Sequence, residues 1–265
     1  MPIIRLALVV LLTAGISVGD SREPVSVRVL EGGVELLTYS YGTLGLFTVH
    51  VLRFQPQAVE PRFVVPPPGK TLSLVSEMPA CAEAVACFNA SFFEAGTDRP
   101  IGLIVSEGKL VQRMKKTSWG AFWLDGQGKA HVTGPKAFRA EVDPAKDVQF
   151  GIQSTPMLVV DGAGRKPSDA ARARRTVMGA DSLGRILVAV FPFPIAHTDV
   201  VLFAKERLDA VQLMNLDGGS STQLVLPGEG GPLVSGVPVA NGIGLFQKST
   251  GDVRNGGGSP MPDSR

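Results

Sequence analysis

The sequence of 265 residues is poor in the residue types that most often hold metals or staple small domains. It contains two cysteines and three widely spaced histidines. Two cysteines cannot build a disulfide framework or a cysteine-only zinc site. The sequence therefore predicts no cofactor, and a divalent metal remains an alternative that no motif supports.

The chain also lacks an excess of one charge and any long hydrophobic run. Its 26 Lys and Arg against 24 Asp and Glu give a formal charge of +2, without the basic excess of nucleic-acid binders. The apolar stretch Leu6–Val18 is too short to cross a bilayer. It follows Arg5 and ends at the small residues Ser17 and Gly19, the pattern of a signal peptide. We expect a signal peptide over residues 1–19 with cleavage near Gly19, export to a periplasm or the medium, no transmembrane segment in the mature chain and no nucleic-acid partner.

What the sequence has in abundance is turn residues, with 31 glycines and 20 prolines. Residues 46–54 alternate apolar and polar side chains, as a half-buried strand does. Four times in the sequence, two apolar segments flank a glycine-containing turn, and this pattern predicts β-hairpins. The turns lie at residues 107–108, 125–128, 161–164 and 181–184.

Helical spacing is found in the apolar residues between 200 and 208, with Thr198–Asp199 as the expected N-cap. One clear helix among many strands predicts an α+β fold: mainly antiparallel sheet built from hairpins, with a few packing helices, in a single domain. We expect this domain to span residues 20–247 and a disordered tail, rich in Gly, Ser and Pro, to follow over 248–265.

Cys81 and Cys87 could form a disulfide if the protein is exported. Six residues of strand would hold their Cα atoms about 20 Å apart, so only a turn between them permits the bond. The sequence leaves open whether they pair.

The segment 211–222 is the most distinctive in the chain. A short apolar strand ends at Asp217 and is followed by Gly218, Gly219 and then Ser220, Ser221 and Thr222. Glycines let a backbone approach a ligand closely, and hydroxyl and N–H groups can form an anion-binding nest. Asp217 is therefore a candidate for acid–base chemistry, the alternative being an aspartate that only fixes a turn.

Three further segments place polar residues at the ends of apolar strands. Asn89 and Ser91 follow one strand, Gln153 and Thr155 precede another, and Arg175 begins a third, followed by Thr176. A cation at the head of a buried strand is costly unless it meets a carboxylate or a phosphate.

Taken in order, these segments resemble the phosphodiester glycosidase family over roughly residues 45–247. The matching pieces are Asn89–Phe93, Gly102–Ile104, Gln153–Leu158, Arg175–Gly179, Leu216–Ser221 and Asn241–Phe246. The resemblance implies a hydrolase that cleaves a sugar-1-phosphodiester linkage, with a small molecule or glycan carrying a sugar-1-phosphate group as its substrate.

The resemblance also implies roles for individual residues. Asp217, Arg175 and Asn89 are the expected catalytic residues: Asp217 as a base or as the charge that stabilises the anomeric carbon, Arg175 on the phosphate, and Asn89 with Gln153 on sugar hydroxyls. The expected substrate-binding residues are Ser91, Gln153, Thr155, Thr176, Gly218, Gly219, Ser220, Ser221 and Asn241. Glu94 is the best candidate for the second carboxylate that glycosidases commonly use.

The chain departs from the family pattern where Ala90–Ser91, Thr155 and Ser220 replace glycines. Added side chains imply an altered pocket, so the family's substrate is not carried over with the fold. Two other functions stay open: a non-catalytic envelope protein that binds glycans or phosphoglycans in the same pocket, and a metal-dependent phosphodiesterase that uses Asp217 with Asp181 or Asp199.

Overall fold

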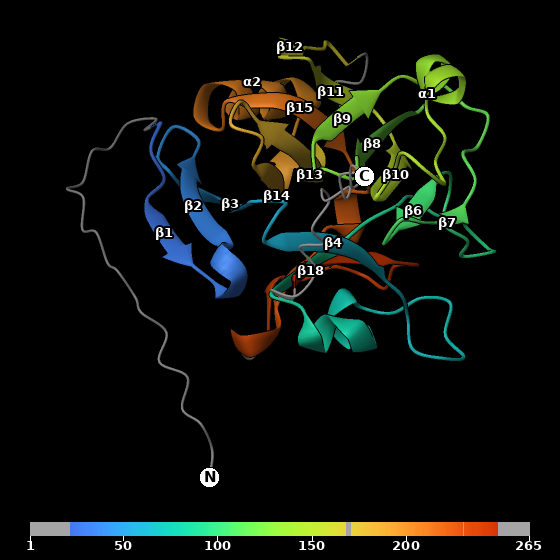
Figure 1. The fold of residues 1–265 in the computed structure, drawn as a ribbon. Helices are drawn as coiled ribbons and strands as arrows, with labels where there is room; N and C mark the ends of the chain where they lie inside the picture. Colours follow the sequence, from blue (N-terminus) through green and yellow to red (C-terminus); the bar gives the residue numbers. More distant parts are fainter. Residues whose placement is uncertain (1–21, 168–170, 230, 249–265) are drawn as a thin grey trace, which may run out of the picture.

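Alternating apolar residues and glycine-rich turns fold the chain into three antiparallel sheets (Figure 1). The structure is a computed structural model that describes residues 22–167, 171–229 and 231–248. The predicted signal peptide, and the predicted tail beyond Lys248, lie outside the described residues. No helix in the described ranges is long and apolar enough to span a membrane.

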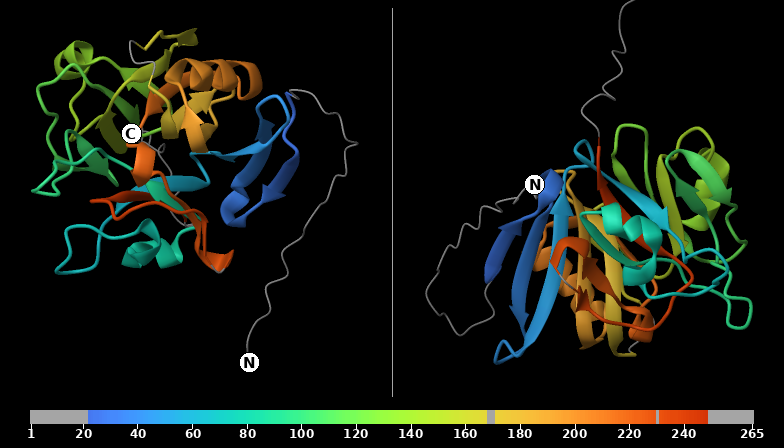
Figure 2. Two further views of the ribbon diagram at one scale, coloured as in Figure 1. Left: turned by 180° about the vertical axis from the view of Figure 1, so that it is seen from behind. Right: turned by 90° about the horizontal axis from the view of Figure 1, so that it is seen from below.

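The first sheet has eight strands in the order β1-β2-β3-β14-β13-β15-β11-β12. Its strands are β1 (Ser26–Val29), β2 (Glu35–Tyr41), β3 (Phe47–Phe54), β11 (Met157–Val160), β12 (Ala163–Gly164), β13 (Ala173–Asp181), β14 (Ile186–Ile195) and β15 (Ala210–Asn215). Seen from below in Figure 2, the blue strands β1–β3 continue the sheet formed by the gold and orange strands.

Two five-stranded sheets complete the domain, in the orders β7-β6-β10-β8-β9 and β17-β16-β5-β18-β4. The second sheet contains β6 (Ile104–Ser106), β7 (Lys109–Gln112), β8 (Gly120–Leu124), β9 (Ala130–Thr133) and β10 (Phe150–Ser154). The third contains β4 (Val59–Val64), β5 (Ala86–Asn89), β16 (Leu224–Leu226), β17 (Gly231–Val234) and β18 (Gly242–Gln247). The prediction of a sheet-rich, mainly antiparallel single domain is confirmed. Three of the expected turns join pairs of antiparallel strands. The fourth, at residues 161–164, is shorter than expected, because Ala163 and Gly164 already form β12, which pairs with β11.

In the described residues, two α-helices cover the sheets: α1 (Pro135–Glu141) and α2 (His197–Arg207). Short 3₁₀ turns lie at η1 (Glu31–Gly33), η2 (Val75–Glu77), η3 (Pro79–Glu83), η4 (Gly219–Ser221) and η5 (Pro227–Glu229). The expected N-cap of α2 is wrong, because the helix already begins at His197 with Ala196 before it and no side-chain cap.

The core lies where the three sheets face one another. Met178 and Met214 of the first sheet, Phe122 and Ile152 of the second, and Phe88 of the third all belong to one buried apolar cluster. A second cluster lies between the first sheet and α2, and a third between the second sheet and α1. Each sheet is thus fixed against the other two, so loops at their strand ends can be held in register.

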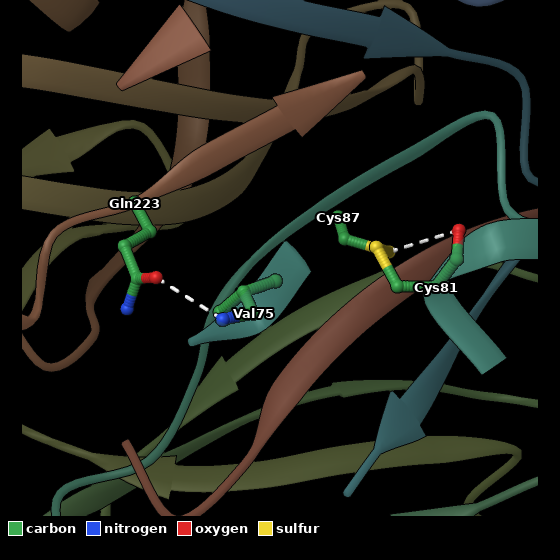
Figure 3. The surroundings of a disulfide bond; sticks show 4 residues. All are labelled: Val75, Cys81, Cys87 and Gln223. Atoms are coloured by element: carbon green, nitrogen blue, oxygen red, sulfur yellow. Dashed lines mark hydrogen bonds between the residues drawn. A yellow bond between two sulfur atoms is a disulfide. The ribbon is translucent and has the colours of Figure 1, made fainter. Parts of the chain in front are cut away.

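The 3₁₀ turn η3 brings Cys81 and Cys87 close enough to form a disulfide bond. It folds the chain back before β5, bringing the Cα atoms of Cys81 and Cys87 to 6.0 Å, and the two sulfurs form a disulfide (Figure 3). Cys87 lies on β5, the strand that ends at Asn89. The bond therefore ties η3 to the strand that leads into the candidate site.

Candidate functional site

Asp217 lies at the junction between the first and third sheets. It follows the end of β15, where the Leu216 N–H donates to the Thr176 carbonyl (2.9 Å) and the Asp217 N–H donates to the Ala90 carbonyl (3.0 Å). Thr176 belongs to the first sheet, and Ala90 follows the last residue of β5 in the third. The backbone of Asp217 is therefore fixed by strands that are far apart in the sequence.

Asn89 connects these strands through its side chain. Its Nδ2 donates to the Asp217 carbonyl (2.6 Å), and its Oδ1 accepts from the Thr176 hydroxyl (2.7 Å) and the Gln223 N–H (3.0 Å). Asn89 is completely buried. These bonds make Asn89 a positioning residue for Asp217.

The Asp217 carboxyl group is half-buried at the centre of this arrangement. Its Oδ1 accepts from the Gly218 N–H (2.8 Å), and the Ser221 hydroxyl also hydrogen-bonds to the carboxyl group. Burial raises the pKa of Asp217, and the bonds from Ser221 and Gly218 oppose that rise. A carboxylate that is poorly hydrated binds a proton more tightly than one in water, so this group is a better proton acceptor than an exposed aspartate.

The two glycines after Asp217 are required by the backbone. A Cβ atom on Gly218 would stand 2.8 Å from the Arg174 carbonyl oxygen, and Gly219 has φ +59°. A side chain at position 218 would collide with the Arg174 carbonyl oxygen. At position 219 the left-handed backbone disfavours any residue other than glycine. The pair lets the chain turn into η4, which brings Ser221 back to the carboxyl group.

Ser91 and Asn241 form a second polar pair beside Asn89. The Ser91 N–H donates to Asn241 Oδ1 (3.0 Å), and Asn241 Nδ2 donates to the Ser91 hydroxyl (3.4 Å). Both side chains are buried. The serine that departs from the family's glycine is thus accommodated by Asn241, which directly precedes β18.

Gln153 uses its amide group to shape a neighbouring loop. Oε1 accepts from the N–H groups of Leu103 (3.1 Å) and Lys115 (2.9 Å), while Nε2 donates to the Lys115 carbonyl (3.0 Å) and the Thr117 hydroxyl (3.1 Å). These contacts hold the segment that carries Trp119. The structure gives the Gln153 amide this supporting role and does not join it to Asp217.

The loop places two half-buried aromatic rings near the site. The rings of Phe92 and Trp119 lie 5.2 Å apart between centroids, tilted by 53°. Phe92 is close in the chain to Ala90, which holds the Asp217 backbone. Partly exposed rings of this kind can pack against the apolar face of a sugar. The contact of Trp119 with Phe92 was not predicted from the sequence, because it forms only when the loop is folded.

Arg175 and Arg174 make different contacts from neighbouring positions on β13. Arg175 Nη2 donates to the Ala171 carbonyl (2.7 Å) and its Nε to the Ile195 carbonyl (3.4 Å). Arg174 Nη2 donates to the carbonyls of Thr222 and Ser235, beside η4. A Cβ atom on Gly218 would stand 3.7 Å from the Arg175 Cα. Both arginines therefore lie at the junction that carries Asp217, and the role of Arg175 in the site stays a prediction.

The candidate second carboxylate, Glu94, is exposed and paired with Lys115 at 2.8 Å. The hydrogen bond and charge of Lys115 lower the pKa of Glu94, which keeps it ionised and does not suit a general acid. Asp181, on β13, lies opposite Ala210 at the beginning of β15. Because Asp217 follows the other end of β15, about 20 Å of extended chain separates Ala210 from Asp217. Asp199 pairs with Arg172 at the start of α2. In the described parts of the chain, no three His, Cys, Asp or Glu side chains gather as a metal-ligand set.

The remaining expected residues lie around this centre. Ser220 is exposed on η4. Thr155 lines a surface cavity of about 360 Å³, and its carbonyl accepts from Asn215 Nδ2 (2.8 Å). The structure thus joins Asn89, Thr176, Asp217 and Ser221 directly, with Ser91 and Asn241 next to them.

Fold and site together define a sheet-rich domain built around one half-buried carboxyl group at a junction of sheets. The profile of the phosphodiester glycosidase family matches residues 82–246, and the chain belongs to this family.

Comparisons with individual proteins show likeness in sequence and in fold. The uncharacterized protein YigE of Escherichia coli (strain K12) is 24% identical over 157 residues, which cover 57% of this chain and 61% of that protein. The chain therefore matches less than two thirds of that relative's length. Among solved structures, the catalytic domain of zebrafish N-acetylglucosamine-1-phosphodiester alpha-N-acetylglucosaminidase, auto-inhibited by its pro-peptide, superposes with a TM-score of 0.63 at 17% identity, covering 84% of this chain and 81% of that one. A hypothetical protein from Synechocystis superposes with a TM-score of 0.60 at 16% identity, covering 84% and 64%.

Proposed function

We propose that this protein is an exported hydrolase that cleaves a sugar-1-phosphodiester linkage, with Asp217 as its catalytic carboxylate. Membership of the phosphodiester glycosidase family supports the reaction class, and the leader-like sequence before Asp20 supports export. The observation that carries the proposal is the setting of Asp217: a half-buried carboxyl group whose backbone is fixed by Asn89 and Ala90 and whose pKa is raised by burial.

The setting of Asp217 suits two tasks in such a reaction. Its raised pKa brings the carboxylate closer to the range in which a general base works well. The same negative charge would stabilise the positive charge that develops at the anomeric carbon of a glycoside. A phosphate leaving group needs little protonation, which is consistent with a site that offers one carboxylate in a catalytic environment.

The surrounding residues would bind the rest of the substrate. The rings of Phe92 and Trp119 offer a face for the sugar. Ser220 and Ser221 offer hydroxyl groups beside Gly218 and Gly219 for phosphate or sugar oxygens. The role of Arg175 on the phosphate stays a prediction, since its described contacts are backbone carbonyls.

The test is hydrolysis of a panel of sugar-1-phosphodiesters by the purified protein and by Asp217→Asn. Asn preserves the shape and can still accept the bonds from Gly218 and Ser221, but it carries no charge and cannot take up the proton. We expect the rate to fall by about 10²–10⁴-fold, the usual contribution of a general base.

The folded state of Asp217→Asn should be at least as stable as the parent at neutral pH. A raised pKa means that folding disfavours the carboxylate, and this cost is present above the folded-state pKa and absent below the unfolded value. Unchanged hydrolysis by Asp217→Asn would assign Asp217 to the turn alone, and tight sugar-phosphate binding without turnover by the parent would identify a binding protein.

A further inference from the structure

A cavity of about 360 Å³ lies on the surface beside the candidate site, and its lining has an unusual charge. It is lined by Ser118, Gly120, Gly134, Thr155, Pro156, Met157, Val160, Arg165, Lys166 and Pro167. Among the described residues, the lining thus holds two cations and two residues with hydroxyl side chains but no carboxylate.

The two cations are not neutralised within the described residues. Neither Arg165 nor Lys166 forms an ion pair in that part of the chain, and both are exposed. The Arg165 N–H donates to the Leu158 carbonyl (2.8 Å), so the backbone that carries them is attached to β11. A fixed backbone with two uncompensated cations over a cavity is suited to an anion, because guanidinium and ammonium groups bind phosphate and carboxylate oxygens.

The position of the cavity relates it to Asp217. The Asn215 N–H donates to the Pro156 carbonyl (3.1 Å), and Asn215 Nδ2 donates to the Thr155 carbonyl (2.8 Å). From Asn215 to Asp217 the extended chain spans about 7 Å. A ligand bound at Asp217 could therefore reach the cavity with a short extension.

The cavity and the aromatic pair lie on different sides of one segment. Ser118 and Gly120 line the cavity, whereas Trp119 between them contacts Phe92. A sugar on the rings and an anion in the cavity would thus occupy separate places around the same carboxylate.

We propose that this cavity is an anion subsite and that the preferred substrate is a sugar-1-phosphodiester whose aglycone carries a second anionic group. The inference rests on the proposed function and goes further by naming the chemical class of the aglycone. Thr155, which stands where the family pattern has glycine, contributes its side chain to this subsite.

The experiment compares two esters of the same sugar 1-phosphate, one with methanol and one with glycerol 3-phosphate through its free primary hydroxyl. For the parent protein we expect KM to be at least 10-fold lower for the charged ester. The double variant Arg165→Ala/Lys166→Ala should lose this preference while its kinetics on the methyl ester stay unchanged. The control Lys70→Ala/Lys109→Ala removes the same charge at exposed positions outside the cavity lining and should keep the preference. Equal KM values for the two esters in the parent, or an undiminished preference in the double variant, would overturn the proposal.

A binding measurement separates this inference from the proposed function. Glycerol 3-phosphate alone, titrated calorimetrically, should bind the parent at least 10-fold more tightly than Arg165→Ala/Lys166→Ala. Such a difference without hydrolysis of either ester would refute the proposed function and leave the anion subsite standing. Hydrolysis of both esters with no difference in glycerol 3-phosphate affinity would refute the subsite.

Discussion

Asn89 offers the sharpest test of how the site is held together. Replacement by Ala removes the partners of three groups at once: the Asp217 carbonyl, the Thr176 hydroxyl and the Gln223 N–H. The position is completely buried, so water cannot readily replace the lost amide. An unsatisfied buried polar group costs about 1–3 kcal/mol. Allowing for relaxation, we expect Asn89→Ala to lower the free energy of unfolding by about 4 kcal/mol, a large part of the 5–15 kcal/mol of a typical domain.

The assay is urea unfolding followed by far-UV circular dichroism. Gln127→Ala, at an exposed turn position, is the control and should change stability by less than about 0.5 kcal/mol. Thr176→Val removes one donor and keeps the shape, at an expected cost of about 1 kcal/mol. Because Thr176 acts through Asn89, the cost of the double variant should be smaller than the sum of the single costs. A loss below about 1 kcal/mol for Asn89→Ala would refute the view that this amide fixes Asp217.

Three further predictions concern neighbouring features. Ser221→Ala removes a hydrogen bond that lowers the pKa of Asp217, so the acidic limb of the pH–rate profile should move to higher pH; an unmoved limb would separate Asp217 from the titration. Replacing Cys81 and Cys87 by Ser opens a short loop with a sequence separation of 6, and differential scanning calorimetry should show a loss of about 2 kcal/mol by the chain-entropy relation, whereas unchanged stability would mean that the bond adds nothing to the fold. Arg175→Lys should raise KM for phosphodiesters by about 10-fold if the guanidinium forks onto phosphate; unchanged KM with lower urea stability would assign Arg175 to its carbonyl partners.

Turn chemistry made much of the fold predictable from sequence. Gly108 and Gly184, among others, mark positions where a hairpin must turn, and strands flank them as expected. The edge strand β1 and the helix α1 were not predicted, since each depends on packing: β1 pairs with β2, and Phe138 of α1 reaches Trp123. Local pattern does not encode such contacts.

The site was predictable in part for a similar reason. Polar residues at the ends of apolar strands identified Asn89, Thr176 and Asp217, and the structure brings them together. The contacts of Arg174 with the Thr222 and Ser235 carbonyls were not predictable, because they depend on where η4 and the following loop lie in the fold. The hydrogen bonds between the Gln153 amide and the loop at residues 115–119 could not be predicted either, because they depend on how that loop folds.

The position of β18 in the third sheet determines when the candidate site can be completed. This strand lies between β5 and β4, and Asn241, which directly precedes it, holds Ala90 and Ser91. Synthesis proceeds from the N-terminus, so β18 is made last among the described strands. A nascent chain that lacks residues 241–247 has an open edge on β5 and no Asn241 to hold Ala90 and Ser91. The surroundings of the proposed catalytic carboxylate, whose own N–H donates to the Ala90 carbonyl, are therefore completed only after residues 241–247 have been synthesised.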